Sequence, residues 1–148
     1  MVARKTRLEH AARWYKQGWL AAEQEHWEEA LRFYKQAVHA DLWFIPAWVG
    51  QIWALYHMGQ LVAAERLCRQ WLCVHQVDDE LYACLGQIAL QQGRIRQARH
   101  YFVLALRFNP SHIPSVEALV RHFEQVGKPK QAAHWREYLR LAKLHQGG

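Results

Sequence analysis

Apolar and polar residues alternate along the chain with the period of an α-helix. Between residues 81 and 89 the apolar positions recur at intervals of three, four and seven, which places them on one helix face. Gly93 ends this pattern, because glycine tolerates the left-handed conformation at a helix C-terminus. A second apolar stripe runs from 95 to 106, and Pro110 ends it, because proline disfavours helix in the preceding residue. The sequence therefore predicts a pair of helices here.

The same pattern recurs every 34 residues without insertion. Alanines and turn glycines both keep this interval: Ala30, Ala64, Ala98 and Ala132, and Gly59, Gly93 and Gly127. A period of this length indicates stacked helix pairs that bury a shared core. We therefore expect an all-α fold with four helix-turn-helix units at 11–44, 45–78, 79–112 and 113–148, preceded by a basic N-terminal tail and the start of the first helix in 1–10.

Short polar motifs predict where two of the helices begin. Thr6 and Glu9 have the spacing of a capping box, so the first helix is expected to begin near Arg7. Asp78 or Asp79 is expected to cap the start of the third unit.

Large and small residues occupy fixed places within each unit. The third unit has Tyr82, Gly86, Ala98, Phe102, Ala105 and Pro110, and the first has Trp14, Gly18, Ala30, Tyr34 and Ala37 at the same places, with Leu42 where the proline would be. Small residues allow helices to approach closely, and a large ring fills the gap beside them. This pattern resembles the tetratricopeptide repeat family. The resemblance implies a right-handed α-solenoid of four repeats and a non-catalytic role in binding other proteins.

The resemblance also implies which residues line a concave binding groove. The corresponding positions are Tyr15 and Trp19 in the first unit, Val49, Trp53, Tyr56 and His57 in the second, Gln87 and Gln91 in the third, and Arg121 in the fourth. Two indoles in one row would anchor apolar or proline-containing side chains of a partner, while the amides and the guanidinium would bond its backbone or an acidic group. The alternative is that the rings pack against neighbouring helices and only narrow the groove.

One specialisation of the family is not expected here. Members that bind the acidic C-terminus of heat-shock chaperones use lysine, asparagine and arginine at defined groove positions. The corresponding residues are Tyr15, Trp19, Gly50, Glu80 and Cys84, none of which matches. A clamp for two carboxylates is therefore not expected.

Composition and charge add a second candidate surface. The 148 residues carry a formal net charge of +6, which permits but does not require binding to nucleic acid or acidic surfaces. Basic residues fall on one side of successive second helices, among them Arg66, Arg69, Arg96 and Arg107. Aromatic residues are not interleaved with them, which argues against single-stranded nucleic acid and favours a solvated helix surface.

The last helix carries apolar residues on several sides. Trp135, Tyr138, Leu141 and Leu144 cannot all point inward from one helix. They either cover the end of the repeat stack or form an exposed patch that binds a partner or a second copy of the chain.

The sequence contains no recognisable catalytic or metal-binding motif. Phosphate loops, hydrolase signatures and paired carboxylates are not found, so no enzyme activity and no cofactor is expected. The ten histidines are interpreted as surface residues, and the three cysteines match no metal or redox spacing, which favours a reducing compartment. No secretory signal and no membrane-spanning segment are recognised, so a cytoplasmic location is expected.

The sequence thus predicts an interaction module that binds a segment of another protein, as an adaptor, an assembly factor or a small chaperone. The alternatives are a structural subunit docked through its convex surface or its C-terminal helix and, with less support, a nucleic-acid binder.

Overall fold

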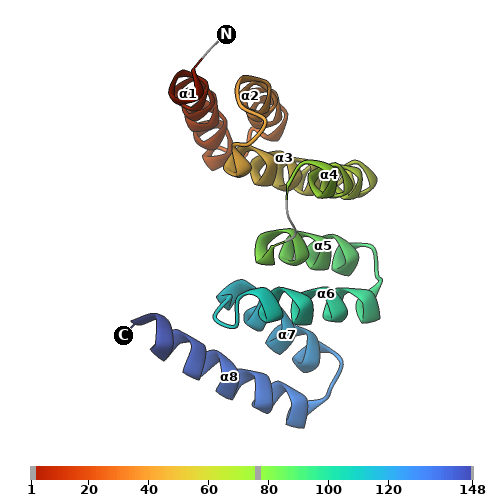
Figure 1. Ribbon diagram of the computed structural model, residues 1–148. Helices are drawn as coiled ribbons and strands as arrows, with labels where there is room; N and C mark the ends of the chain where they lie inside the picture. The colour runs from red at the N-terminus through yellow and green to blue at the C-terminus, as the bar shows by residue number, and fades with distance from the viewer. Residues whose placement is uncertain (1–2, 76–77, 148) are drawn as a thin grey trace. The chain divides into compact units, whose positions relative to one another are not determined.

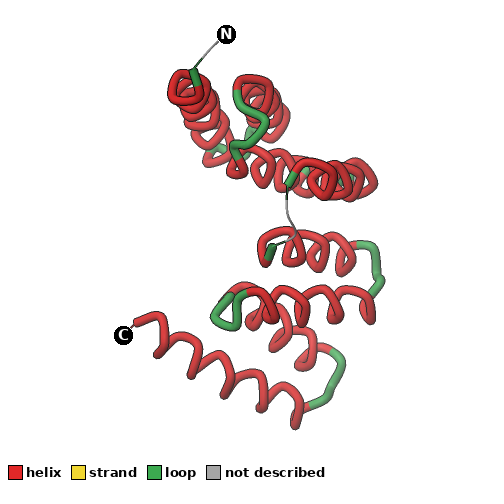
Figure 2. Tube along the Cα trace, viewed as in Figure 1, coloured by secondary structure: helices red, strands yellow, loops and turns green. Residues whose placement is uncertain are grey.

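The chain folds into helices joined by short turns. The structure is a computed structural model that describes residues 3–75 and 78–147. Figure 1 traces the eight helices of this part from the N-terminus to the C-terminus, and Figure 2 shows that the described residues contain helices and loops but no strand. The predicted all-α class is confirmed. The predicted unit boundaries extend to residues 1–2, 76–77 and 148, which lie outside the described residues.

The helices divide into two compact bodies, called unit 1 and unit 2 from here on. Each of them is built from two helical hairpins, and a hairpin corresponds to one of the four predicted helix-turn-helix repeats. Unit 1 contains α1 (Arg4–Glu23), α2 (Trp27–Ala40), α3 (Ile45–His57) and α4 (Leu61–Val74). Unit 2 contains α5 (Asp79–Gln91), α6 (Ile95–Phe108), α7 (Ile113–Gln125) and α8 (Pro129–Gly147). Consecutive helices pack on each other within each unit, and α1 also contacts α3.

Two predicted helix starts have different outcomes. The first helix begins at Arg4 rather than near Arg7, so Thr6 and Glu9 lie inside it and form no capping box. Arg4 and Lys5 are good helix formers, which is why the helix extends upstream of that motif. Asp78 does cap α5, because its side chain accepts a hydrogen bond from the Leu81 backbone N–H at 2.9 Å.

The turns inside the hairpins share one backbone conformation. Gly59, Gly93 and Gly127 lie at equivalent places with φ of 76°, 75° and 71°. Glu25 occupies this place in the first hairpin with φ of 60°. A residue with a Cβ is less stable than glycine in this left-handed region.

The core of unit 1 depends on one tyrosine ring held against glycine backbones. Tyr34 on α2 is 4% exposed. A Cβ on Gly18 of α1 would lie 2.7 Å from this ring, and a Cβ on Gly50 of α3 would lie 2.8 Å from it. Only glycine therefore allows the three helices to pack at this spacing.

Unit 2 repeats this contact with a phenylalanine. A Cβ on Gly86 of α5 would lie 2.7 Å from the Phe102 ring of α6, and that ring is 1% exposed. Phe102 belongs to a core cluster with Val116, Leu119 and Phe123 of α7. The predicted pairing of small residues with large rings is thus present in both units.

Replacing Gly18 with alanine is expected to destabilise unit 1. The ring of Tyr34 cannot move aside, because Gly50 confines it on the other side. Overpacking costs about 1–3 kcal/mol, and the better helix propensity of alanine returns up to about 1 kcal/mol. We expect the free energy of unfolding in urea to fall by roughly 1–2 kcal/mol. The control Gln17→Ala, exposed on the same helix, should change it by less than about 0.5 kcal/mol. A free energy of unfolding that Gly18→Ala leaves unchanged would refute the close contact.

Candidate functional site

An aromatic cluster lies where α3 ends beside the start of α2. It consists of Trp27, Trp53, Tyr56 and His57. The Trp27 indole stacks on the His57 imidazole with centroids 4.2 Å apart and planes 11° apart. Trp53 makes an edge contact with Tyr56 at 5.2 Å, and Tyr56 makes one with His57 at 5.3 Å. Trp53 and Tyr56 are half-buried and His57 is exposed, so the cluster is fixed by mutual contact and still reaches the surface.

Trp27 was not among the predicted groove residues. It begins α2, and consecutive helices in a hairpin array run in opposite directions, so the start of α2 lies beside the end of α3. The 34-residue period repeats this position as Trp27, Leu61 and Ile95. An aromatic residue at a place that is otherwise aliphatic was the signal available in the sequence.

The remaining predicted residues of unit 1 have different environments. Trp19 on α1 is 48% exposed and holds the same place in its hairpin as Trp53 does in the next. Val49 is half-buried. Tyr15 is also half-buried, and its ring lies 5.7 Å from Tyr34 and 5.6 Å from Phe44, so much of it contributes to the core. Burial raises the pKa of Tyr34 to about 12, with a smaller contribution from Tyr15.

The predicted residues of unit 2 are polar. Gln87 is half-buried and Gln91 is exposed, one helical turn apart on α5, and Arg121 is exposed on α7. They add amide groups and one positive charge to the surfaces of the first helices in these hairpins.

Two histidines are buried, which corrects the interpretation of all ten as surface residues. His112, the residue before α7, is 6% exposed. Its Nδ1 lies 2.7 Å from the Ser115 Oγ, and its Nε2 lies 3.2 Å from a Glu80 carboxylate oxygen. Asn109 donates a hydrogen bond to Asp79 at 3.0 Å beside this pair. The sequence could not predict this burial, because the acidic partner Glu80 comes from the start of α5, 32 residues away.

This polar network connects the starts of α5 and α7. Ser115 is fully buried, so its hydroxyl is not presented to a ligand. A buried polar group is stable only when it has partners, and here each His112 nitrogen has one. The arrangement is that of a structural contact between the two helices.

His122 on α7 is the second buried histidine, at 7% exposure. Burial lowers its pKa below the ordinary histidine value, and the nearby charges of Arg99 and Lys128 lower it further. The same Arg99 guanidinium lies 5.9 Å from the centre of the Phe123 ring. Burial and the two nearby cations thus favour the neutral imidazole.

The predicted basic residues all lie on exposed helix surfaces. Arg66 and Arg69 are exposed on α4, and Arg96 and Arg107 are exposed on α6. Arg69 pairs with Glu65 one turn earlier, at 3.2 Å.

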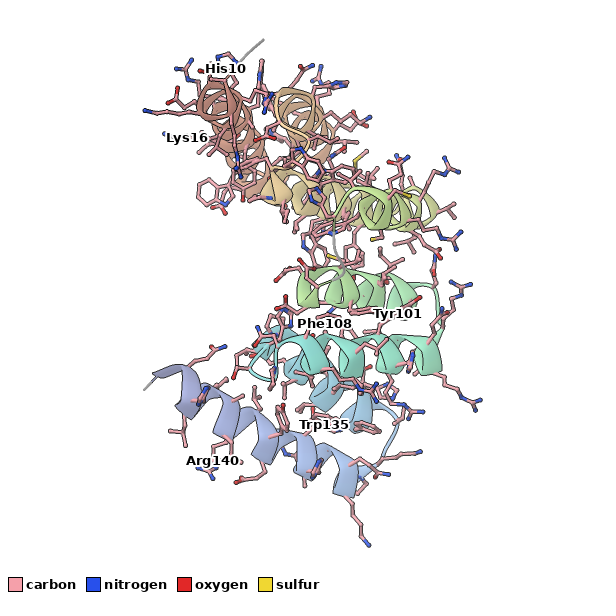
Figure 3. All side chains as sticks on the ribbon, in the orientation of Figure 1. His10, Lys16, Tyr101, Phe108, Trp135 and Arg140 are labelled. Carbon is pink, nitrogen blue, oxygen red and sulfur yellow. The ribbon has the colours of Figure 1, made fainter. Side chains whose placement is uncertain are left out.

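The apolar residues of α8 divide into two sets. Trp135 and Tyr138 are half-buried and pack against the core cluster of unit 2; Figure 3 labels Trp135 on this helix. The Tyr138 hydroxyl donates a hydrogen bond to the Pro110 carbonyl at 2.8 Å. Leu141 and Leu144 are 52% and 61% exposed. The helix therefore covers the core with one side and presents leucines on another.

Comparison with known proteins gives the class to which this fold belongs. Residues 79–112 match the family model of the tetratricopeptide repeat. The fold is similar to the Arabidopsis OM64 TPR domain, with a TM-score of 0.70 and 18% identity over 80% of this chain and 98% of that one. It is also similar to MamA, with a TM-score of 0.72 and 15% identity over 93% and 80% of the two chains.

A third similar structure is YrrB, described as a TPR protein with an unusual peptide-binding site. The TM-score is 0.62 and the identity 16%, over 87% of this chain and 66% of that one. A search of the curated proteins gives no match. Residues 79–112 form a tetratricopeptide repeat, and the fold of the chain is that of tetratricopeptide-repeat proteins.

None of the helices in 3–75 and 78–147 is both long enough and apolar enough to span a membrane. In the same ranges, no three side chains among histidine, cysteine, aspartate and glutamate converge as metal ligands.

The burial of His122 predicts a pH-dependent stability. Its pKa is lower in the folded than in the unfolded state, so below about pH 6.5 the unfolded chain takes up the proton first and the folded state loses stability. We expect wild type to lose more free energy of unfolding than His122→Gln when the pH is lowered from about 7.5 to about 5. The exposed His134→Gln is the control and should follow wild type. Equal losses in wild type and His122→Gln, measured by urea unfolding, would contradict the assignment.

Proposed function

We propose that the chain is a non-catalytic protein–protein interaction module that binds an extended or helical segment of a partner protein. An adaptor, an assembly factor and a small chaperone all fit this role. Support comes from the tetratricopeptide match in 79–112 and from the fold, because helical repeat arrays use extended concave surfaces for binding. The similar protein YrrB is described as having a peptide-binding site.

The observation that carries the proposal is the surface-reaching set of rings on the first helices of unit 1. Trp19 is nearly half exposed, and Trp53 is held by edge contacts to Tyr56 and by the neighbouring His57. Tryptophan and tyrosine dominate binding energy at protein interfaces. Rings already fixed by their neighbours lose little conformational freedom on binding, which favours affinity.

The same rings indicate the chemistry of the partner segment. Indole and phenol surfaces favour apolar or proline-containing side chains. In unit 2, Gln87, Gln91 and Arg121 would bond a peptide backbone or an acidic group. Unit 1 is therefore proposed to bind apolar side chains of the partner, and unit 2 to bind backbone or acidic groups.

The cysteines support a reducing compartment such as the cytoplasm. Cys68 and Cys73 form no disulfide and are free thiols. Burial, with a smaller effect of Glu65, raises the pKa of the Cys68 thiol to about 12, so this residue is unreactive. Free thiols are typical of reducing compartments.

Removing two indoles tests the groove. The double variant Trp19→Ala plus Trp53→Ala should lose at least about 10-fold in affinity for a partner captured from the native cell extract, because hot-spot truncations cost about 2 kcal/mol or more. The control Trp43→Ala removes an indole that is 62% exposed but lies outside the proposed groove. It should bind like wild type. Circular dichroism should show unchanged helicity in both.

Retention of the partner by the folded double variant would overturn the groove assignment. Equal loss of binding in the Trp43→Ala control would show that exposed indoles capture proteins without specificity.

The C-terminal helix supports a second candidate role, as a structural subunit or a homo-oligomer docked through α8. The exposed Leu141 lines a hollow of about 310 Å³ together with Pro110, Ser111, Tyr138, Ala142 and His145. Leu141 and Leu144 together form an exposed apolar strip beside this hollow. Such a strip is a feature of interaction surfaces.

Leu144→Lys tests this second role, because a charge on the exposed strip disfavours an apolar contact. If the protein self-associates through α8, this variant should raise the dissociation constant of self-association at least about 10-fold, as the loss of a central anchor residue does. Leu8→Lys is the control, since Leu8 is also exposed but lies on α1. Sedimentation velocity gives the mass. Self-association that Leu144→Lys leaves unchanged would exclude this surface. Tyr138 is a poorer probe, because its hydroxyl and ring also hold α8 in place.

A further inference from the structure

Unit 1 has a second concave surface, away from the aromatic cluster, between α1 and α2. It is a cleft of about 560 Å³, lined by Trp14, Glu29, Arg32, Phe33, Lys35, Gln36 and His39. Trp14 and Trp19 are five residues apart on one helix, so they point about 140° apart around its axis. The cleft is therefore a different surface from the proposed groove.

Two stacked rings form the floor of the cleft. The centroids of Trp14 and Phe33 are 5.9 Å apart and their planes 27° apart. Trp14 is 39% exposed. A volume of this size lies in the range of small-ligand sites and would hold one large side chain and its neighbours.

The third hairpin has an equivalent ring pair with a further ring beside it. Tyr82 and Tyr101, 68 residues after Trp14 and Phe33, stack with planes also 27° apart, at 6.2 Å. The Phe108 ring contacts Tyr82 of this pair, with the centroids 5.6 Å apart; Figure 3 labels Tyr101 and Phe108 on the same helix.

The first hairpin lacks this further ring. Phe108 is the last residue of the 14-residue α6, and the last residue of the 14-residue α2 is Ala40. The methyl group of Ala40 cannot reach over the Trp14 indole as the ring of Phe108 reaches Tyr82. In the second hairpin, the equivalent Trp48 is 4% exposed, and His75 contacts its ring at 5.5 Å. The aromatic surface at this place is therefore left open in the first hairpin.

The charges around the cleft favour an acidic ligand. Arg32 and Lys35 line it, and within the described residues neither pairs with a carboxylate. Glu29 lies on the same wall, and its carboxylate is 3.7 Å from His26. Two cations against one carboxylate leave this partly apolar wall with a net positive charge, which attracts carboxylates.

We propose that this cleft binds an acidic peptide segment of a partner protein that carries an aromatic side chain. The aromatic side chain seats against Trp14, in the place that Phe108 takes in the third hairpin, and flanking carboxylates pair with Arg32 and Lys35. This site is independent of the groove formed by Trp19 and Trp53.

The test uses the peptide Asp-Glu-Phe-Asp-Glu, acetylated and amidated at its ends, added to the full chain labelled with ¹⁵N. Each tryptophan indole N–H gives one signal, and the Trp14 signal is identified by its loss in Trp14→Phe. At about 1 mM peptide, a concentration that detects weak binding, the Trp14 signal should shift. The shift should weaken at high salt. Asp-Glu-Ala-Asp-Glu and Lys-Arg-Phe-Lys-Arg should shift it at least about 10-fold less at the same concentration.

Two kinds of variant then test the assignment. Ala40→Phe adds the further ring seen in the third hairpin and should abolish the shift, while Ala133→Phe, an exposed position on α8, should leave it unchanged. Arg32→Glu plus Lys35→Glu should weaken binding by at least about 10-fold. Arg96→Glu plus Lys130→Glu reverses the same amount of charge on unit 2 and should have little effect. Circular dichroism checks that each variant folds.

Several results would overturn the proposal. These are no Trp14 shift with the acidic aromatic peptide, an equal shift in folded Ala40→Phe, or an equal shift with the basic peptide. A larger shift with a ten-nucleotide thymidine oligomer would make the cleft a nucleic-acid site, and a shift produced by protein concentration alone would make it a contact between copies. Trp19→Ala plus Trp53→Ala should leave the Trp14 shift intact, so failure of the groove and failure of the cleft are separate outcomes.

Discussion

The contact of one aromatic ring with glycine backbones sets the helix spacing on which both units depend. Tyr34 fits between α1 and α3 only because Gly18 and Gly50 have no Cβ, and Phe102 meets Gly86 in the same way. Such a contact combines close backbone approach with burial of a large ring. Since α1 and α3 are held at this distance, the side chains that point away from the ring present a surface whose geometry is fixed by the core.

The eight tryptophans of the chain have different environments. Trp48 and Trp71 are buried, because helix packing encloses their positions. Trp19 and Trp43 are exposed. Trp27 and Trp53 are half-buried, and both contact the His57 ring. Tryptophan is costly to expose, yet Trp14 and Trp19 reach the surface of unit 1 on two sides of α1. Exposed apolar surface of this kind is typical of surfaces that bind other molecules.

Unit 2 has the same helical plan and a different chemistry. Its first helices carry Gln87, Gln91 and Arg121 at the surface, while His112 and His122 are enclosed. The network of His112 with Ser115 and Glu80 adds a polar contact between α5 and α7 to the apolar contacts around Phe102. The exposed tryptophans therefore belong to unit 1, and the surface of the first helices in unit 2 is polar.

The sequence by itself determined the all-α fold, the 34-residue period and the small-to-large pairs such as Gly86 with Phe102, because each depends on spacing along the chain. It also located Trp19, Trp53, Tyr56 and His57 as candidate binding residues, since these follow from position within a repeat. Only the tertiary structure decided that His112 is buried, that Trp27 stacks on His57, and that Ala40 leaves the Trp14 cleft open. These features join residues 26 to 32 positions apart, and contacts between helices depend on packing geometry that no local pattern encodes.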